Sequence, residues 1–330
     1  MPRDWMPGRP SWLPRRLGNV FATLVALLAV LAVAGFCYEQ MALAKAARRA
    51  PPAAEMIDVG GYRLHLKCAG AGSPVVVMDG ALGESMRTWD TIWPDVAKTT
   101  RVCRFDRAGL GWSDAGPLPR TSGRTAGELK TLLERAHVDG PFVVVGHSLG
   151  GLNMRVFAGR YPTAVAGIVL VDSPTPEVYR RMPPKTLRAQ QAAMRKLRWL
   201  HRAASFGLPR ALGVCGGDDE PHCRRWSGTV LAEWDDLPQS SAEVAEVHGF
   251  GATPLMVLSA DPKLKTSWLT EEERAAWDEM QLELLSLSSN SSRVIAQGSH
   301  HFIQQVRPDV VIAAIGRLVT AARASGASKP

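Results

Sequence analysis

The sequence has few cysteines and no metal-binding cysteine pattern. Five cysteines occur among 330 residues, and no two of them are spaced as C-x-x-C. A structural zinc site of the paired-thiolate kind is therefore not expected. Four cysteines follow the apolar N-terminal segment, namely Cys68, Cys103, Cys215 and Cys223. Their even number allows one or two disulfides in an exported domain, with Cys215 and Cys223 closing a short loop, and four buried thiols are the alternative.

The sequence also lacks the basic stripe of a nucleic-acid-binding protein. The formal net charge is +8, but basic and aromatic residues do not alternate along any segment. A nucleic acid is therefore not expected as a partner. The basic excess lies mostly at the N-terminus and in the middle third of the chain, and acidic membrane lipid explains it better. No internal repeat is present.

Charge is absent from residues 17–38, which are long enough to cross a hydrocarbon core of ~30 Å. A basic tail, residues 1–16, precedes this segment. Residues 39–55 are expected to form a juxtamembrane helix that ends at Pro51-Pro52, as a short stalk. The basic side chains nearest the segment lie on its N-terminal side. This favours a cytoplasmic N-terminus, and hence a single-pass membrane protein with an extracytoplasmic catalytic domain. A signal peptide cleaved after Ala32-Val33-Ala34 is the alternative.

After residue 55 the periodicity predicts strands that alternate with helices, which indicates a mostly parallel sheet covered on both faces. The expected core comprises residues 56–173 and 254–324. Between them, residues 174–253 show no strand periodicity, and they are predicted to form a helical lid inserted after the sixth strand. The strands are expected at 57–59, 62–67, 74–78, 102–105, 142–145, 166–171, 254–259 and 292–297.

The residues Gly146-His147-Ser148-Leu149-Gly150 fit the pattern G-x-S-x-G between a predicted strand and a predicted helix. In this context the serine lies at the tip of a sharp turn with its hydroxyl exposed, as a nucleophile. The first helical N–H, that of Leu149, can then stabilise an oxyanion. A plain glycine-rich turn is the alternative, and the strand and helix on either side favour the nucleophile.

Other polar residues and loops follow predicted strands. The loop Asp79–Gly83 can supply a second oxyanion donor, from the N–H of Ala81 or Leu82. Asp106 and Arg107 are expected to be structural, through hydrogen bonds with each other or with the backbone. Two aspartates follow later strands and two histidines follow the last one, namely Asp172, Asp261, His300 and His301.

These features resemble the α/β-hydrolase fold family, and within it bacterial membrane-anchored serine hydrolases or esterases of undefined substrate. The closest stretches are DVGGYRLHLKCAGAGSPVVVMDGALGES, TRVCRFDRAGLGWSD and GPFVVVGHSLGGLNMRVFAGRYPTAVAGIVLVDS. The resemblance covers most of residues 56–175 and resumes at 293–316, without the lid. Asp79 departs from the histidine that relatives carry before the oxyanion loop.

The resemblance implies a triad in which Ser148 is the nucleophile, His301 the general base and Asp172 the acid. Asp261 is the alternative acid, because relatives carry theirs near this point of the chain. The oxyanion donors are expected to be Ala81 and Leu149. The substrate is expected to contact Leu82, His147 and His300.

The expected reaction is hydrolysis of a carboxylic ester, apolar or lipid-like, through an acyl-enzyme, without a metal or an organic cofactor. A serine at the turn argues against haloalkane dehalogenase and epoxide hydrolase chemistry, which in this fold uses an aspartate nucleophile. The expected partners are a small-molecule ester and the membrane. The alternatives are an amide, thioester or C–C bond hydrolase on the same triad, and a non-catalytic scaffold.

Overall fold

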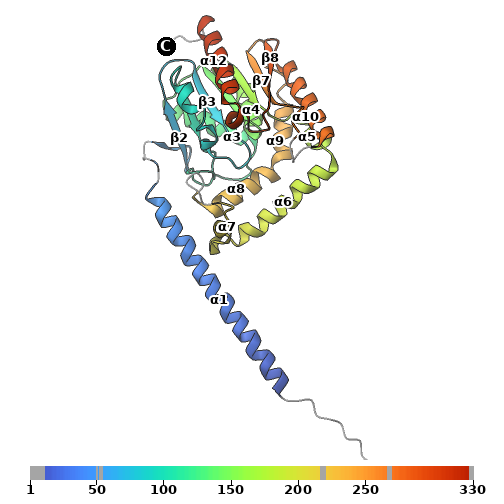
Figure 1. Ribbon diagram of the computed structural model, residues 1–330. Coiled ribbons are helices and arrows are strands. Elements are labelled where there is room, and N and C mark those ends of the chain that lie inside the picture. Colours follow the sequence, from blue (N-terminus) through green and yellow to red (C-terminus); the bar gives the residue numbers. More distant parts are fainter. Residues whose placement is uncertain (1–11, 50, 52–54, 216–220, 266–269, 327–330) are drawn as a thin grey trace, which may run out of the picture.

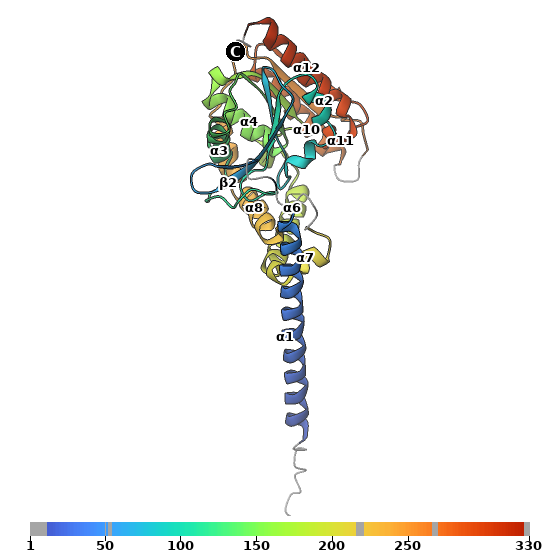
Figure 2. The same cartoon turned by 90° about the vertical axis from the view of Figure 1, so that its left-hand side faces the viewer.

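A computed structural model describes residues 12–49, 51, 55–215, 221–265 and 270–326. It shows a twisted sheet with helices on both faces, a group of helices beside one end of the sheet, and a long N-terminal helix that extends away from the body (Figure 1). The view turned by 90° shows the same helices around the upper part of the long helix (Figure 2). The residues expected to be catalytic all belong to the body.

The eight-stranded sheet has the order β1-β2-β4-β3-β5-β6-β7-β8. Strand β2 pairs antiparallel with both of its neighbours, β1 and β4. All other neighbouring strands pair in parallel. This confirms the expected mostly parallel sheet. The strands are β1 (Met56–Asp58), β2 (Arg63–Ala69), β3 (Val75–Asp79), β4 (Val102–Phe105), β5 (Phe142–His147), β6 (Val165–Val171), β7 (Leu255–Ala260) and β8 (Ser291–Ala296).

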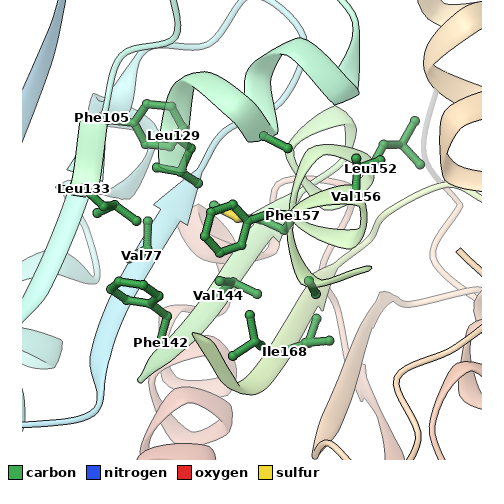
Figure 3. Close-up of a cluster of buried hydrophobic side chains, with 14 of the residues drawn as sticks. Val77, Phe105, Leu129, Leu133, Phe142, Val144, Leu152, Val156, Phe157 and Ile168 are labelled. Atoms are coloured by element: carbon green, nitrogen blue, oxygen red, sulfur yellow. The ribbon is translucent and has the colours of Figure 1, made fainter. Parts of the chain in front are cut away.

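Alternate side chains of the central strands fill two apolar layers, because successive strand residues point to opposite faces. Val144 packs below Phe157 of α4 and near Leu129 of α3 (Figure 3), whereas Val143 packs with Ile315 of α12 on the other face. The core is therefore buried on both sides of the sheet, as its continuous β-branched runs predict. The helices beside the sheet are α2 (Trp93–Ala97), α3 (Ser122–Arg135), α4 (Leu149–Arg160), α10 (Glu271–Glu283), α11 (Ile303–Val306) and α12 (Pro308–Ala324).

The chain between β6 and β7 contains only helices in its described part, so the expected helical insertion after the sixth strand is present. The division of the chain into domains at the residues named above stays a prediction. The helices of the insertion are α5 (Val178–Arg181), α6 (Pro184–Arg202), the 3-10 helix η4 (Ala204–Phe206), α7 (Leu208–Ala211), α8 (Cys223–Asp235) and α9 (Leu237–Ala245).

The N-terminal helix α1 (Trp12–Ala47) is 36 residues long. Its part Leu17–Ala47 is long and apolar enough to cross a membrane, and its most apolar window is not buried in the protein. Such a helix fits a membrane anchor or a signal sequence. The helix continues through the first half of the expected stalk, and residues 1–11 of the expected tail lie outside the described part.

Two disulfides join the four cysteines that follow α1. Cys68 on β2 pairs with Cys103 on β4, and Cys215 pairs with Cys223 at the start of α8. The alternative of four free thiols is therefore wrong for this structure. Cys37, within α1, is free.

Candidate active site

Ser148 lies at a strained turn between β5 and α4, with φ 52° and ψ −118°. A positive φ is uncommon for a residue with a side chain, and such strain is frequent at functional sites. The turn is possible because glycines flank the serine. A Cβ atom on Gly150 would lie 2.4 Å from the carbonyl oxygen of Asp79, and one on Gly146 would lie 2.4 Å from that of Gly150. The backbones at the turn therefore approach so closely that only glycine fits at positions 146 and 150.

The ring of His301 is held by a buried carboxylate. Nδ1 of His301 lies 2.7 Å from Oδ2 of Asp172, the residue that follows β6. The other oxygen, Oδ1, accepts hydrogen bonds of 3.0 Å from the N–H of Ala260 and from Nε1 of Trp277. Burial opposes ionisation, but the hydrogen bond with His301 and the other donors outweigh it, so the pKa of Asp172 is lower than usual. An ionised Asp172 keeps the proton of a neutral His301 ring on Nδ1.

Asp261, the alternative acid, has different partners. Its two carboxylate oxygens accept hydrogen bonds of 2.9 Å from the backbone N–H groups of Lys263 and Gly298. These bonds hold the loop after β7 against the loop that leads to His301. The structure thus places Asp172, and not Asp261, on Nδ1 of His301.

A buried arginine fixes the loop that follows β3. Arg107 donates to the carbonyl oxygens of Gly80 at 2.9 Å and Ala81 at 2.8 Å, and it forms ion pairs with Asp79 and Glu233. The N–H of a trans peptide points opposite to the C=O of the preceding residue. The N–H groups of Ala81 and of the residue after it therefore point away from Arg107. Arg107 is structural, as expected, but its partners are these groups and not Asp106.

The N–H of Ala81 is not available to a substrate in this structure. It donates to Oε2 of Glu84 at 2.8 Å, and the same oxygen lies 3.2 Å from Nδ1 of His147. Burial opposes ionisation of Glu84, but the contacts with His147 and the Ala81 N–H outweigh it, and the pKa of Glu84 is lower than usual. The negative Glu84 carboxylate therefore accepts the hydrogen bond that the Ala81 N–H was expected to donate to an oxyanion. The Leu149 N–H begins α4 and so has no acceptor within its own helix.

The three expected substrate contacts differ in position. His147 is fully buried, and its Nε2 lies 3.0 Å from the carbonyl oxygen of His301, so it supports the His301 loop. Burial lowers the pKa of His147, which favours the neutral ring. His300 is half-buried and lines a cavity of about 30 Å³ beside Trp277. Leu82 is partly buried against the lid.

Sequence reasoning missed Glu84 and Trp277. The sequence contained one signal for Glu84. It lies three residues after Ala81, a spacing at which a side chain can accept a hydrogen bond from a backbone N–H. Trp277 lies on α10, and its bond to Asp172 joins positions 105 residues apart. No local pattern announces such a contact. Among the described residues, no group of three or more His, Cys, Asp and Glu side chains is arranged to hold a metal ion.

A family model described as the alpha/beta hydrolase fold matches residues 74–214. The chain has the α/β-hydrolase fold. An AB hydrolase superfamily protein of Gibberella zeae is 26% identical over 286 residues, which cover 76% of this chain and 87% of that protein. A probable transporter of Hormonema carpetanum, efuK, is 32% identical over 136 residues, but these are 39% of this chain and only 20% of the relative's length.

Solved structures share the fold at low sequence identity. The crystal structure of DBJA superposes with a TM-score of 0.61 and 17% identity, and covers 82% of this hydrolase-fold chain and 98% of its own. The enol-lactonase from Burkholderia xenovorans LB400 superposes with a TM-score of 0.53 and 18% identity, over 80% of this chain and 99% of its own. The family model and these structures together support a hydrolase fold.

Proposed function

We propose that the protein is a membrane-anchored serine hydrolase that cleaves carboxylic esters through an acyl-enzyme. The observation that carries the proposal is the buried Asp172 carboxylate at 2.7 Å from Nδ1 of His301, in a fold whose strained turn presents Ser148. A serine hydroxyl is a weak nucleophile unless a base takes its proton, and a base works best when a third group holds its tautomer. These residues supply all three roles.

In the proposed mechanism, Nε2 of His301 takes the proton of the Ser148 hydroxyl while Oγ attacks the ester carbonyl carbon. Asp172 stabilises the imidazolium that forms. The N–H of Leu149 and the N–H of Ala81, once Glu84 has released it, hold the oxyanion. His301 then gives the proton to the leaving alcohol. Water repeats the sequence on the acyl-enzyme and releases the carboxylic acid.

The proposed substrate class is an apolar or lipid-like ester. A cleft of about 1350 Å³ lies between α1 and the body, and it reaches the loop that contains Gly83 and Glu84. Apolar side chains, including Met41 and Trp226, form part of its lining. An enol-lactonase among the structural neighbours supports ester chemistry, because a lactone is a cyclic ester. This volume exceeds the about 300–1,000 Å³ of typical small-molecule pockets, so the cleft has room for a ligand larger than a drug-sized molecule.

We also propose that α1 anchors the protein with its body outside the cytoplasm. Two disulfides in the described body support this location, because such bonds persist mainly in oxidising compartments. The basic residues before the apolar segment support the same orientation.

The test is hydrolysis of p-nitrophenyl esters from acetate to palmitate by the full chain in detergent micelles, beside Ser148→Ala. The proposal expects turnover that disappears in the variant, and labelling of Ser148 by a fluorophosphonate probe. A folded wild-type protein that neither turns over an ester nor takes the label would exclude the serine mechanism. Labelling together with cleavage of only amides or thioesters would keep the triad and change the substrate.

A further inference from the structure

The tip of the lid, residues 204–214, packs directly against α1 (Figures 1 and 2). The approach is so close that a Cβ atom on Gly35 would lie 2.3 Å from the carbonyl oxygen of Phe206. Four residues further along α1, the Glu39 carboxylate accepts hydrogen bonds of 2.8 and 2.9 Å from the Arg210 guanidinium, and both side chains are largely buried. The lid tip is therefore fixed at one height along α1.

That height corresponds to the edge of a bilayer. The apolar segment begins at Leu17, and a helix crosses a hydrocarbon core with about 20 residues, which brings it to about residue 37. Glu39 is the first charged residue after this uncharged stretch. If α1 spans a membrane, Gly35 and Glu39 lie at its outer boundary, and the lid tip that contacts them lies there as well.

The lid tip exposes apolar side chains at this height. The exposed fractions are 49% for Phe206, 45% for Leu208, 60% for Leu212 and 38% for Val214. Clustered apolar exposure of this kind marks a contact with a membrane or another protein, and the contact with α1 favours the membrane. The neighbouring helix α6 exposes basic side chains that suit anionic headgroups, namely Arg188, Arg195, Lys196 and Arg202.

The cleft beside α1 joins this surface to the site. Its lining includes Val214 of the lid tip, Met41 and Lys45 of α1, and Gly83 and Glu84 of the loop after β3. Glu84 in turn contacts the Ala81 N–H. The cleft therefore begins where the lid tip would meet the bilayer and ends at Glu84, the residue that accepts a hydrogen bond from the proposed oxyanion donor.

We propose that the lid tip inserts into the outer phospholipid boundary beside α1, and that ester substrates reach Ser148 from the bilayer along this cleft. The inference rests on the proposed membrane anchor. It also specifies the substrate of the proposed function, because it makes a membrane-dissolved ester the physiological class of substrate. The lid tip then acts as a second, shallow contact with lipid in addition to the transmembrane helix.

The first test measures insertion and needs no enzymatic activity. The full chain, in a Cys37→Ser background, is placed in phosphatidylcholine vesicles that contain some phosphatidylglycerol. An environment-sensitive fluorophore is attached at Leu212→Cys or, as a matched control, at Leu282→Cys, a leucine on α10 that is 49% exposed. We expect lipids with a nitroxide near the headgroup end of the acyl chain to quench position 212 at least threefold more than position 282. Equal quenching at the two positions overturns the insertion.

The second test measures delivery of substrate. Leu208→Asp and Leu212→Asp in the full chain are compared with Leu282→Asp on two esters, water-soluble p-nitrophenyl acetate and a long-chain ester dissolved in the same vesicles. We expect the lid-tip variants to lose at least tenfold in rate on the vesicle ester and less than twofold on the soluble one. Equal losses on both esters, or no loss on either, overturn delivery from the bilayer. Absence of hydrolysis of both esters by the wild type contradicts the proposed function, and the quenching test still decides the insertion.

Discussion

The change Asp172→Asn tests which carboxylate orients His301. Asp172 accepts three hydrogen bonds, from His301 Nδ1, the Ala260 N–H and Trp277 Nε1. An asparagine has one accepting oxygen, and its NH₂ group can only donate. If the oxygen keeps the two bonds with Ala260 and Trp277, the NH₂ group faces Nδ1 of His301 and stabilises the tautomer that carries its proton on Nε2.

That tautomer cannot take the proton of Ser148. In a Ser-His-Asp triad the same change lowers kcat by about 10⁴-fold, which corresponds to a barrier higher by about 5.5 kcal/mol. We expect a loss of this size in Asp172→Asn. The matched change Asp261→Asn removes one backbone hydrogen bond, worth about 1 kcal/mol of stability, and we expect it to lower kcat less than tenfold.

The assay is kcat for p-nitrophenyl butyrate at neutral pH, with the urea midpoint of each variant as the measure of folding. The pKa of Asp172 is lower than usual, because the hydrogen bond with His301 and the other donors outweigh burial, so this carboxylate is ionised at the neutral pH of the assay. The reasoning is refuted if Asp261→Asn loses more activity than Asp172→Asn while both variants remain folded. It is also refuted if Asp172→Asn keeps more than a tenth of the wild-type kcat.

Three further changes test other parts of the structure. Glu84→Ala should raise kcat at least ~10-fold, because the Glu84 carboxylate accepts from the Ala81 N–H and repels an oxyanion at that donor; two unit charges ~4 Å apart repel each other by ~4 kcal/mol at an effective dielectric of 20. An unchanged kcat would give the donor role to another loop N–H. Removing the disulfide with Cys68→Ser and Cys103→Ser should lower the free energy of unfolding by about 4 kcal/mol, since the bond closes a loop with a sequence separation of 35; a calorimetric change below about 1 kcal/mol would contradict this. Burial and the nearby Arg225 lower the pKa of His222 from 6.5 to about 4, so the unfolded chain binds more protons between these values and stability should fall as pH falls from 6.5 to 4; the urea midpoint of His222→Gln should fall less over the same interval.

The strands and the serine turn could be predicted because their evidence is local. The β-branched runs at β3, β5 and β6 are buried on both faces, and the glycines around Ser148 fit only a close approach of backbones. The resemblance favours Asp172 over Asp261 as the acid, but no local pattern in the sequence distinguishes the two. Both follow neighbouring strands of the sheet, and the partner of His301 depends on the path of the loop after β8 and on a tryptophan from a distant helix.

The N-terminal helix shows a second limit of local reasoning. A juxtamembrane helix is expected after residue 38, and α1 continues without a break to Ala47. No glycine or proline occurs between Glu39 and Ala47, so nothing in that segment ends a helix. The ion pair between α1 and the lid tip joins Glu39 and Arg210, which lie 171 positions apart in the sequence. Only the folded chain reveals this contact.

The buried ion pairs of Arg107 restrict how a substrate can reach Ser148. Glu233 of α8 accepts hydrogen bonds of 2.7 and 3.1 Å from Arg107, which also holds the loop that carries Ala81. Lifting α8 from the body would separate these buried charges, at a cost of about 3–5 kcal/mol, and would release the proposed oxyanion loop at the same time. An opening of that kind would dismantle the site as it admitted the substrate. Access along the cleft beside α1 leaves the Arg107 contacts in place, which favours the membrane side of the lid as the route to Ser148.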